Sequence, residues 1–301
     1  MNSAEPVNSA EPVSSVDSLG AVDEAWACAN AVAARHGLRV VEQAGLPALR
    51  QLADLLARVW HARSPDEIVN LSMLRNLAHS GNYVAGAYRG DDLVGASIGF
   101  FGQGHLHSFI TGVEPGTQGR GVGYLLKQHQ RAWTLSRGVP EVRWTYDPLV
   151  GRNAYFNLSK LGADVVEYLP EFYGSMTDGI NAGDLSDRLY VHWRLASPRA
   201  VAAARGEAAE VDVGALLDGG ARHLLDRVDG APQSNVDDSR TSGAKTLLVA
   251  VPQDVEALRR DDPVGALQWR YAVRDALVPL MADGCRITGM SRYGFYVLER
   301  P

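Results

Sequence analysis

Cysteine is scarce in this sequence, and long hydrophobic runs are missing from it. Cys28 and Cys285 are the two cysteines in 301 residues, and they lie far apart without metal-ligand spacing. This argues against a disulfide framework and against a zinc site. No window approaches the roughly 18 consecutive apolar residues that a membrane-spanning helix needs. No Lys or Arg precedes Arg35, which argues against secretory and twin-arginine signals. We therefore expect a reduced, cytoplasmic protein that holds no metal and does not enter a membrane.

A basic excess is missing as well. The sequence has 29 Lys and Arg against 35 Asp and Glu, so its net charge is −6. Nothing in this balance indicates an electrostatic surface for nucleic acid, and we expect no nucleic-acid partner. With 46% hydrophobic residues, a chain of this length is expected to form one large or two modest domains with a sizeable core.

The most informative segment is a glycine-rich turn between an expected strand at 106–113 and an expected helix at 124–137. Its glycines are Gly119, Gly121 and Gly123. Such a turn exposes backbone N–H groups at the positive end of a helix dipole, and phosphate is the usual ligand there. The segment is not a P-loop, because no Gly-Lys-Ser/Thr closes it. It is not a dinucleotide fingerprint either, because the third glycine would fall on Tyr124.

The chain order of the expected elements is strand, two helices, three strands, helix, strand, helix and two strands. Before them, residues 2–7 and 8–13 repeat one hexapeptide, Asn-Ser-Ala-Glu-Pro-Val, which predicts a disordered tail over 1–18. Hydrophobic periodicity and turn residues set the boundaries of the elements. The expected strands and helices are 38–41, 46–61, 66–79, 82–88, 93–101, 106–113, 124–137, 142–146, 153–161, 165–169 and 189–195.

The last third of the chain is harder to interpret. Residues 197–244 are rich in Ala, Gly, Asp and Ser, which predicts a linker or irregular segment. Residues 245–301 are expected to form a β-α-β extension that extends the sheet or covers the acceptor side of a cleft. The sequence leaves open whether this extension is a lid or the interface of a homodimer.

The glycine-rich turn and the element order together resemble the GNAT superfamily of N-acyltransferases. Gln118, Gly121 and Gly123 match its Gln/Arg-x-x-Gly-x-Gly/Ala pattern, and the element order of 38–195 matches its fold. The resemblance implies the α/β fold of this family, with a mixed central sheet whose fourth and fifth strands splay apart. We expect the acyltransferase domain to span 19–196 and to begin with an Ala-rich N-terminal helix over 19–36. The resemblance also implies acetyl-CoA or another acyl-CoA as co-substrate and no metal. The implied cofactor-binding residues are Thr111, Gly112, Val113, Gln118, Gly119, Arg120, Gly121, Val122, Gly123, Tyr124 and Asn153.

The family's chemistry points to three candidate catalytic residues. His107 falls where histone-acetyltransferase members of the family place a catalytic glutamate, and an imidazole near pKa ~6.5 suits removal of a proton from an ammonium. Strand alternation predicts that His107 shares a face with Phe109, Thr111 and Val113. Asp147 ends the fifth strand and is expected to orient His107 or bind the acceptor ammonium. The alternatives are a structural strand histidine and a turn aspartate before a proline.

The third candidate, Tyr155, is suggested by a difference between this sequence and the family's pattern. The family's helix after the fifth strand often reads Asn-x-x-Ala-x-x-x-Tyr and ends Leu-Gly-Phe. Here Ala154 falls on the family alanine, but Leu158 falls where a tyrosine often protonates the leaving thiolate. The general acid is therefore Tyr155, or water, or absent. The segment 168–181 between the last two strands, with its aromatic, acidic and Gly residues, is expected to form an acceptor-binding lid, or else an ordered surface loop.

The wording of residues 147–189 resembles a bacterial branch of the family known as predicted acetyltransferases, and related enzymes are associated with N-succinylation of amino acids. The predicted function is acyl-CoA-dependent N-acylation, by acetyl or succinyl transfer, of a small-molecule amine such as an amino acid or secondary-metabolite amine. Two alternatives stay open. One is a non-catalytic acyl-CoA-binding or regulatory protein, which Leu158 favours. The other is protein N-acylation.

Overall fold

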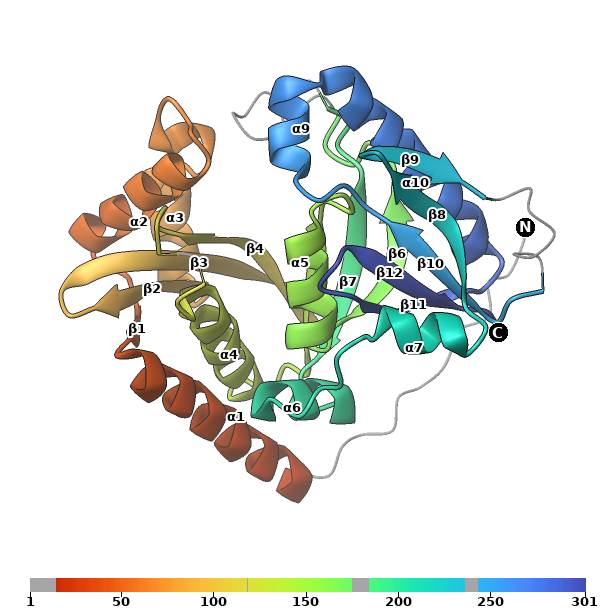
Figure 1. Cartoon of the computed structure of the whole chain (residues 1–301). Helices are drawn as coiled ribbons and strands as arrows, with labels where there is room; N and C mark the ends of the chain where they lie inside the picture. Colours follow the sequence, from red (N-terminus) through yellow and green to blue (C-terminus); the bar gives the residue numbers. More distant parts are fainter. Residues whose placement is uncertain (1–14, 118, 175–183, 236–242) are drawn as a thin grey trace, which may run out of the picture.

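The computed structural model describes residues 15–117, 119–174, 184–235 and 243–301. Its strands form a seven-stranded sheet in the order β1-β2-β3-β4-β5-β7-β6 and a five-stranded sheet in the order β11-β12-β10-β8-β9 (Figure 1). The first sheet comprises β1 Arg39–Glu42, β2 Tyr83–Arg89, β3 Asp92–Gly102, β4 His105–Val113, β5 Glu141–Tyr146, β6 Asp164–Leu169 and β7 Arg188–Arg194. The second comprises β8 Arg222–Val228, β9 Ala231–Ser234, β10 Thr246–Ala250, β11 Arg286–Met290 and β12 Phe295–Glu299.

The first sheet has the strand sequence that the resemblance implies. Its neighbouring strands are antiparallel except for β4 and β5, which are parallel. A parallel pair needs a crossover connection, which is usually a helix. Here the crossover is α4 (Val122–Leu135), and the glycine-rich turn lies where β4 passes into it. The expectation of a mixed α/β sheet with this element order is confirmed.

Helices cover the two faces of this sheet unequally. The helices α2 (Leu46–Val59) and α3 (Leu71–His79), with the short 3₁₀ turn Pro65–Glu67 between them, pack on the face of β2 and β3 that carries Val84, Ala96 and Ile98. We call this the α2 face. The opposite face, called the α4 face, packs against α4. The long helix α1 (Ser15–His36) lies against α4 on its outer side (Figure 1).

A buried charge fixes α1 on α4. The guanidinium of Arg131, which is fully buried, donates to the Glu24 carboxylate of α1 at 2.7 Å and to the backbone oxygen of Leu195 at 2.7 Å. The Trp26 and His129 rings meet edge to face at 5.1 Å. The N-terminal helix is therefore part of the folded unit rather than an appendage.

The structure corrects the expectation of an irregular segment over 197–244. That stretch contains α6 (Pro198–Arg205), α7 (Val213–Asp218), β8 and β9. The Ser197 side chain caps α6 and the Asp212 side chain caps α7. These elements are short, and β8 is held by parallel pairing with β10, about 25 residues further along the chain. Local composition does not report such long-range pairing, so Ala, Gly and Asp suggested a loop.

The C-terminal residues also form a sheet of their own instead of widening the first one. The helices α9 (Val255–Asp261) and α10 (Pro263–Ala282) connect β10 to β11. β11 and α10 contact β6, and β11 also contacts α5 (Gly151–Tyr155) and the π-helical turn η2 (Phe156–Lys160). One buried apolar cluster runs through both parts, from Tyr146 and Leu158 to Val249 and Tyr296. In the described part of the chain, no helix is long and apolar enough to cross a membrane.

Candidate active site

The glycine-rich turn leads directly into α4. Gly121 is the N-cap of α4, with φ of +80°, and Gly119 has φ of +77°. Left-handed backbone of this kind is costly for any residue with a Cβ atom. Arg120 between them is exposed, whereas Val122 is buried. The turn thus presents backbone N–H groups at a helix N-terminus, as an anion site requires. Gln118 lies outside the described residues.

Gly121 is also in close contact with the end of α1. A Cβ atom at this position would lie 2.6 Å from the imidazole of His36. We expect Gly121→Ala to lower the free energy of unfolding by about 1–2 kcal/mol through its backbone conformation, and to weaken acyl-CoA binding at least about tenfold, because the turn must shift away from His36. Chemical denaturation and calorimetric titration with acetyl-CoA measure the two effects.

Gly104→Ala is the matched control, because Gly104 has φ of +73° and open space where its Cβ would lie. It should carry the same backbone cost and leave acyl-CoA affinity unchanged. Equal affinity for acetyl-CoA in both variants would show that the glycine-rich turn is not part of the acyl-CoA-binding site.

The strands β4 and β5 separate soon after they meet. In the described part of the chain, they pair only at Leu106 with Val142 and at His107 with Arg143. Beyond these pairs the β5-facing edge of β4 is free over Thr111, Gly112 and Val113, while its other edge stays paired with β3. This opening lies beside the N-terminus of α4. The arrangement is consistent with the splayed fourth and fifth strands expected from the sequence.

A β-bulge in β4 overturns the predicted grouping of side chains around His107. Register between β3 and β4 shifts at Phe109, so this residue is extra on its strand. An extra residue reverses the facing of everything beyond it. The Thr111 hydroxyl bonds to Ser97 at 2.8 Å, and Val113 packs with α4. Both therefore lie on the α4 face, whereas His107 lies on the α2 face with Phe100.

His107 belongs to a row of side chains across the α2 face. Register pairs Phe100 with His107, His107 with Arg143 and Arg143 with His192. The His107 and Phe100 rings lie 5.0 Å apart. Glu141 accepts a hydrogen bond from Arg143 at 2.7 Å and lies 3.0 Å from His192. Burial, with smaller contributions from His105 and Lys127, lowers the pKa of His107 below its usual 6.5. The imidazole is therefore neutral at pH 7, as a general base must be.

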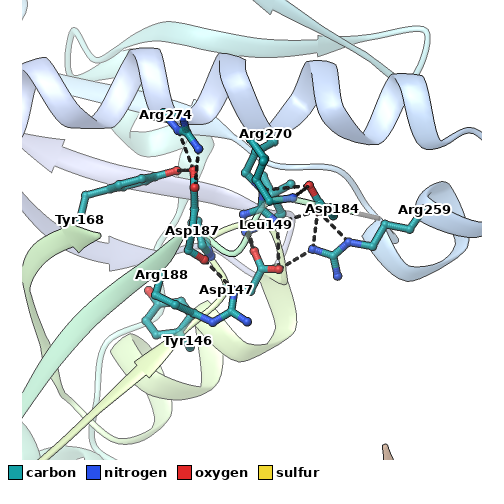
Figure 2. A network of polar contacts seen from close by, with 12 residues as sticks. Tyr146, Asp147, Leu149, Tyr168, Asp184, Asp187, Arg188, Arg259, Arg270 and Arg274 are labelled. Carbon is teal, nitrogen blue, oxygen red and sulfur yellow. Dashed lines mark hydrogen bonds and ion pairs between the residues drawn. The ribbon is translucent and has the colours of Figure 1, made fainter. Parts of the chain in front are cut away.

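Asp147 has different partners from those expected. Only 7% of it is exposed, and its carboxylate accepts hydrogen bonds from Arg270 at 2.8 and 3.0 Å, from Arg259, and from the Leu149 N–H at 2.9 Å (Figure 2). Burial alone would raise the pKa of Asp147, but the charges and hydrogen bonds of Arg270 and Arg259 hold it well below its usual range. Its carboxylate is directed at the C-terminal helices rather than at His107.

Asp147 is one member of a larger ionic cluster. Arg270 also donates to Asp184 at 2.7 Å, and Arg274 donates to Asp187 at 2.9 and 2.5 Å. Tyr168 donates to Asp187 at 2.6 Å (Figure 2). The ionic cluster, defined by Asp147, Asp184, Asp187, Arg259, Arg270 and Arg274, joins the end of β5 and the segment before β7 to α9 and α10. Sequence reasoning missed its arginines, because nothing local marks which surface of α10 meets β5.

Tyr155 and Leu158 lie on a helix whose register changes. α5 passes at Phe156 into the π-helical turn η2, and such a turn holds an extra residue. Leu158 is 1% exposed and packs in the large apolar cluster. The Tyr155 hydroxyl donates to Glu210 at 3.4 Å, and the Arg292 guanidinium lies 5.3 Å from its ring. The structure therefore gives Tyr155 polar partners in the C-terminal part of the chain.

Tyr124 and Asn153 are the remaining predicted cofactor contacts. Tyr124, on the first turn of α4, donates its hydroxyl to the backbone oxygen of Ala203 at 3.1 Å, and Asn153 is exposed on α5. The expected lid is described up to Gly174, whereas residues 175–183 lie outside the described residues. In the described portion, Phe172 and Tyr173 are exposed and stack edge to face at 4.7 Å. The Tyr173 hydroxyl shares a hydrogen bond of 3.1 Å with Thr145 of β5.

Polar residues of β5 and β7 were a second omission, although a signal for them exists. Glu141, Arg143 and Thr145 alternate with buried Val142, Trp144 and Tyr146, and this period-2 pattern places them on one face.

Within the described residues, no group of three or more His, Cys, Asp or Glu side chains is arranged to hold a metal ion.

Comparison with known proteins supports an acetyltransferase domain in the first half of the chain. Residues 24–157 match the family model of the acetyltransferase (GNAT) domain. No curated protein matches the chain. The chain therefore contains a GNAT acetyltransferase domain within residues 24–157.

Solved structures similar to this chain are shorter proteins. The ribosomal-protein-S18-alanine N-acetyltransferase from Escherichia coli is 14% identical, with 53% of this chain and 95% of that one covered and a TM-score of 0.43. An aminoglycoside 6'-N-acetyltransferase from Enterococcus faecium is 18% identical, with 53% and 98% covered and a TM-score of 0.41. An aminoglycoside 6'-N-acetyltransferase complexed with coenzyme A is 17% identical, with 53% and 98% covered and a TM-score of 0.40.

Proposed function

We propose that this chain transfers an acetyl or succinyl group from acyl-CoA to the amine of a small molecule, with an amino acid or a secondary-metabolite amine as acceptor. The observation that carries the proposal is the opening between β4 and β5 beside the glycine-capped N-terminus of α4. Acyl-CoA would supply the acyl group as an activated thioester. The chain's own residues would hold it, deprotonate the amine and fix the geometry of direct attack.

The residues of the turn and of β4 fit such a co-substrate. Backbone N–H groups of Gly119 to Gly123 suit a pyrophosphate. The free edge of β4 over Thr111–Val113 offers backbone groups to the amides of the pantetheine arm, in the manner of an added strand. A backbone N–H near the bulge at Phe109 would serve as oxyanion donor.

The α2 face supports an amino acid as acceptor. His107 would remove the proton from the acceptor ammonium. Arg143 and Glu141 lie on the same face and bear opposite charges. The exposed fraction of their side chains is 28% for Arg143 and 13% for Glu141. Arg143 and Glu141 are paired with each other at 2.7 Å, and a zwitterion would bind by exchanging this pair for contacts of Arg143 with its carboxylate and of Glu141 with its ammonium. The exposed aromatic rings of Phe109, Phe172 and Tyr173 would cover its apolar part.

The alternative of a non-catalytic acyl-CoA-binding protein has one observation in its favour. Leu158 is buried where the family often has the tyrosine that protonates the thiolate, and the Tyr155 hydroxyl is bonded to Glu210. The two functions differ in turnover and not in affinity for acyl-CoA.

We expect acetyl- or succinyl-CoA to raise the melting temperature, because a ligand that binds only the folded state stabilises it by mass action. Thermal shift is measured with acetyl-, succinyl- and longer acyl-CoA, and release of free thiol is followed with a panel of D- and L-amino acids and amines. Stabilisation with turnover supports the N-acyltransferase and names the donor. Stabilisation without turnover on any acceptor supports the binding protein. No stabilisation by any CoA species contradicts both.

A further inference from the structure

One lysine in this protein is buried without a carboxylate partner. Only three lysines occur in the sequence, at 127, 160 and 245, so nearly all the cations are arginines. Lys160 and Lys245 are exposed. Lys127 lies on α4 and is 5% exposed. Because an unpaired buried ammonium is costly, its presence at this position calls for a function.

Lys127 bridges the point where β4 and β5 part. Its ammonium donates to the Ser108 hydroxyl of β4 at 2.7 Å and lies 4.0 Å from the centre of the Trp144 ring of β5. Ser108 and Trp144 are the residues that follow the last pair of the two strands, His107 with Arg143. The third contact of the ammonium is the Gln130 side-chain oxygen at 3.2 Å. The ammonium therefore lies directly behind the opening, on the α4 face.

The surroundings make this amine easy to deprotonate. Burial lowers the pKa of Lys127 from 10.5 to about 7. Each element packed around it contributes a neutral group: Ser108 from β4, Trp144 from β5 and Gln130 from α4 itself. Among the described residues, the titratable group coupled to it is His107, on the other face of β4, and no acidic side chain pairs with it. An acid with a pKa close to the working pH is well suited to donate a proton during turnover.

We propose that Lys127 is the general acid of this enzyme, donating a proton from its ammonium to the departing thiolate of CoA. This rests on the proposed N-acyltransferase function. The acceptor ammonium first loses one proton through His107 to water. As the C–N bond forms and the thioester C–S bond breaks, His107 takes a second proton from the amine nitrogen and then releases it to water. The thiolate takes one from Lys127, which regains a proton from water. The products are the amide and CoA with a free thiol. Lys127 would thus perform, from α4, the role that Leu158 cannot perform from the helix after β5.

The first test does not depend on turnover. The thiol of CoA bound to the protein is titrated with pH by the ultraviolet absorbance of its thiolate. An ammonium beside a thiol lowers the thiol's pKa, so the bound thiol should titrate at least about one pH unit below free CoA. In Lys127→Met the shift should vanish, and in the exposed control Lys245→Met it should remain. An identical titration in wild type and Lys127→Met would overturn the proposal.

The second test is the pH profile of kcat/KM, which reports the pKa values of the free enzyme. His107 must be neutral, so the rate should rise through a pKa below 6.5. Lys127 must be protonated, so the rate should fall as the pH rises above its pKa of about 7. Lys127→Met should lower kcat by about 10²-fold or more and lose the alkaline limb. Acetyl-seleno-CoA should restore much of the rate in the variant, because a less basic leaving group needs no proton donor.

Two further results separate the possible failures. Methionine removes a buried charge, so Lys127→Met should melt no lower than wild type, and Lys127→Gln provides a second folded variant if it does. Turnover that persists in both variants with an unchanged pH profile would overturn the role of Lys127 and leave the N-acyltransferase standing. Absence of CoA binding by the wild type would contradict the proposed function itself.

Discussion

Replacing His107 with alanine is expected to lower kcat/KM about 10²–10⁴-fold, the usual contribution of a general base, while acyl-CoA still binds. The reason is positional as well as chemical. His107 belongs to the last pair before β4 and β5 part, it lies on the α2 face, and burial keeps its imidazole neutral at pH 7. Free-thiol release with the best acceptor from the panel measures the effect, and thermal shift with acetyl-CoA measures binding.

The pH dependence gives a second signature of the same residue. Because the pKa of His107 is below 6.5, wild-type kcat/KM should rise with pH through that pKa before it reaches the alkaline limb assigned to Lys127. His107→Ala should lose this acid limb. His105→Ala is the matched control, since His105 lies two residues earlier on the same strand and bonds to the Gln103 backbone oxygen at 3.0 Å. Equal losses in the two variants would show that His107 has no specific role.

Replacing Arg270 with methionine is expected to lower the free energy of unfolding by about 3–5 kcal/mol, because it leaves two buried carboxylates to share the cation of Arg259. Arg270 is fully buried, and it donates to both Asp147 and Asp184. The exposed fraction of those two side chains is 8% and 5%, so water does not replace the lost partner. Urea denaturation, analysed at constant m-value, measures the change.

Arg260→Met is the control, because Arg260 lies on the adjacent α9 and its partner Asp261 is exposed. It should leave stability nearly unchanged. The folded-state pKa of Asp147 is below its unfolded value of about 3.9, so its contribution is present at neutral pH and is lost as pH falls below that value. Wild type should therefore lose stability in acid more steeply than Arg270→Met. Parallel acid curves would contradict this assignment.

Element order was the property best predicted from the sequence. Hydrophobic periodicity placed every strand of the first sheet, because a half-buried strand and an amphipathic helix leave different periods in the chain. The glycine turn was also identified, since Gly119 and Gly121 adopt a backbone conformation that other residues avoid. Both patterns involve residues that are close together in the chain, so they can be recognised in a single sequence.

Two departures from regular counting share one physical origin, which is the insertion of a residue into a strand or a helix. At Phe109 a bulge reversed the facing of Thr111, and from Phe156 a π-helical turn changed the register of the helix that carries Leu158. Beyond either insertion, strand alternation or helical periodicity no longer predicts which face a side chain lies on. Asp147 was misassigned for a different reason: its partner Arg270 is 123 residues away, and no pattern in either segment announces the other.

The ionic cluster has a consequence for how this protein unfolds. The match to the acetyltransferase domain ends at residue 157. Asp147 within it, and Asp184 and Asp187 beyond it, are neutralised by arginines that lie after residue 255 in the chain. The shared apolar cluster crosses the same boundary. Removing the last hundred residues would expose an apolar face and would also leave those buried carboxylates without arginine partners. The shared apolar cluster and the ionic cluster therefore predict that the two sheets unfold together.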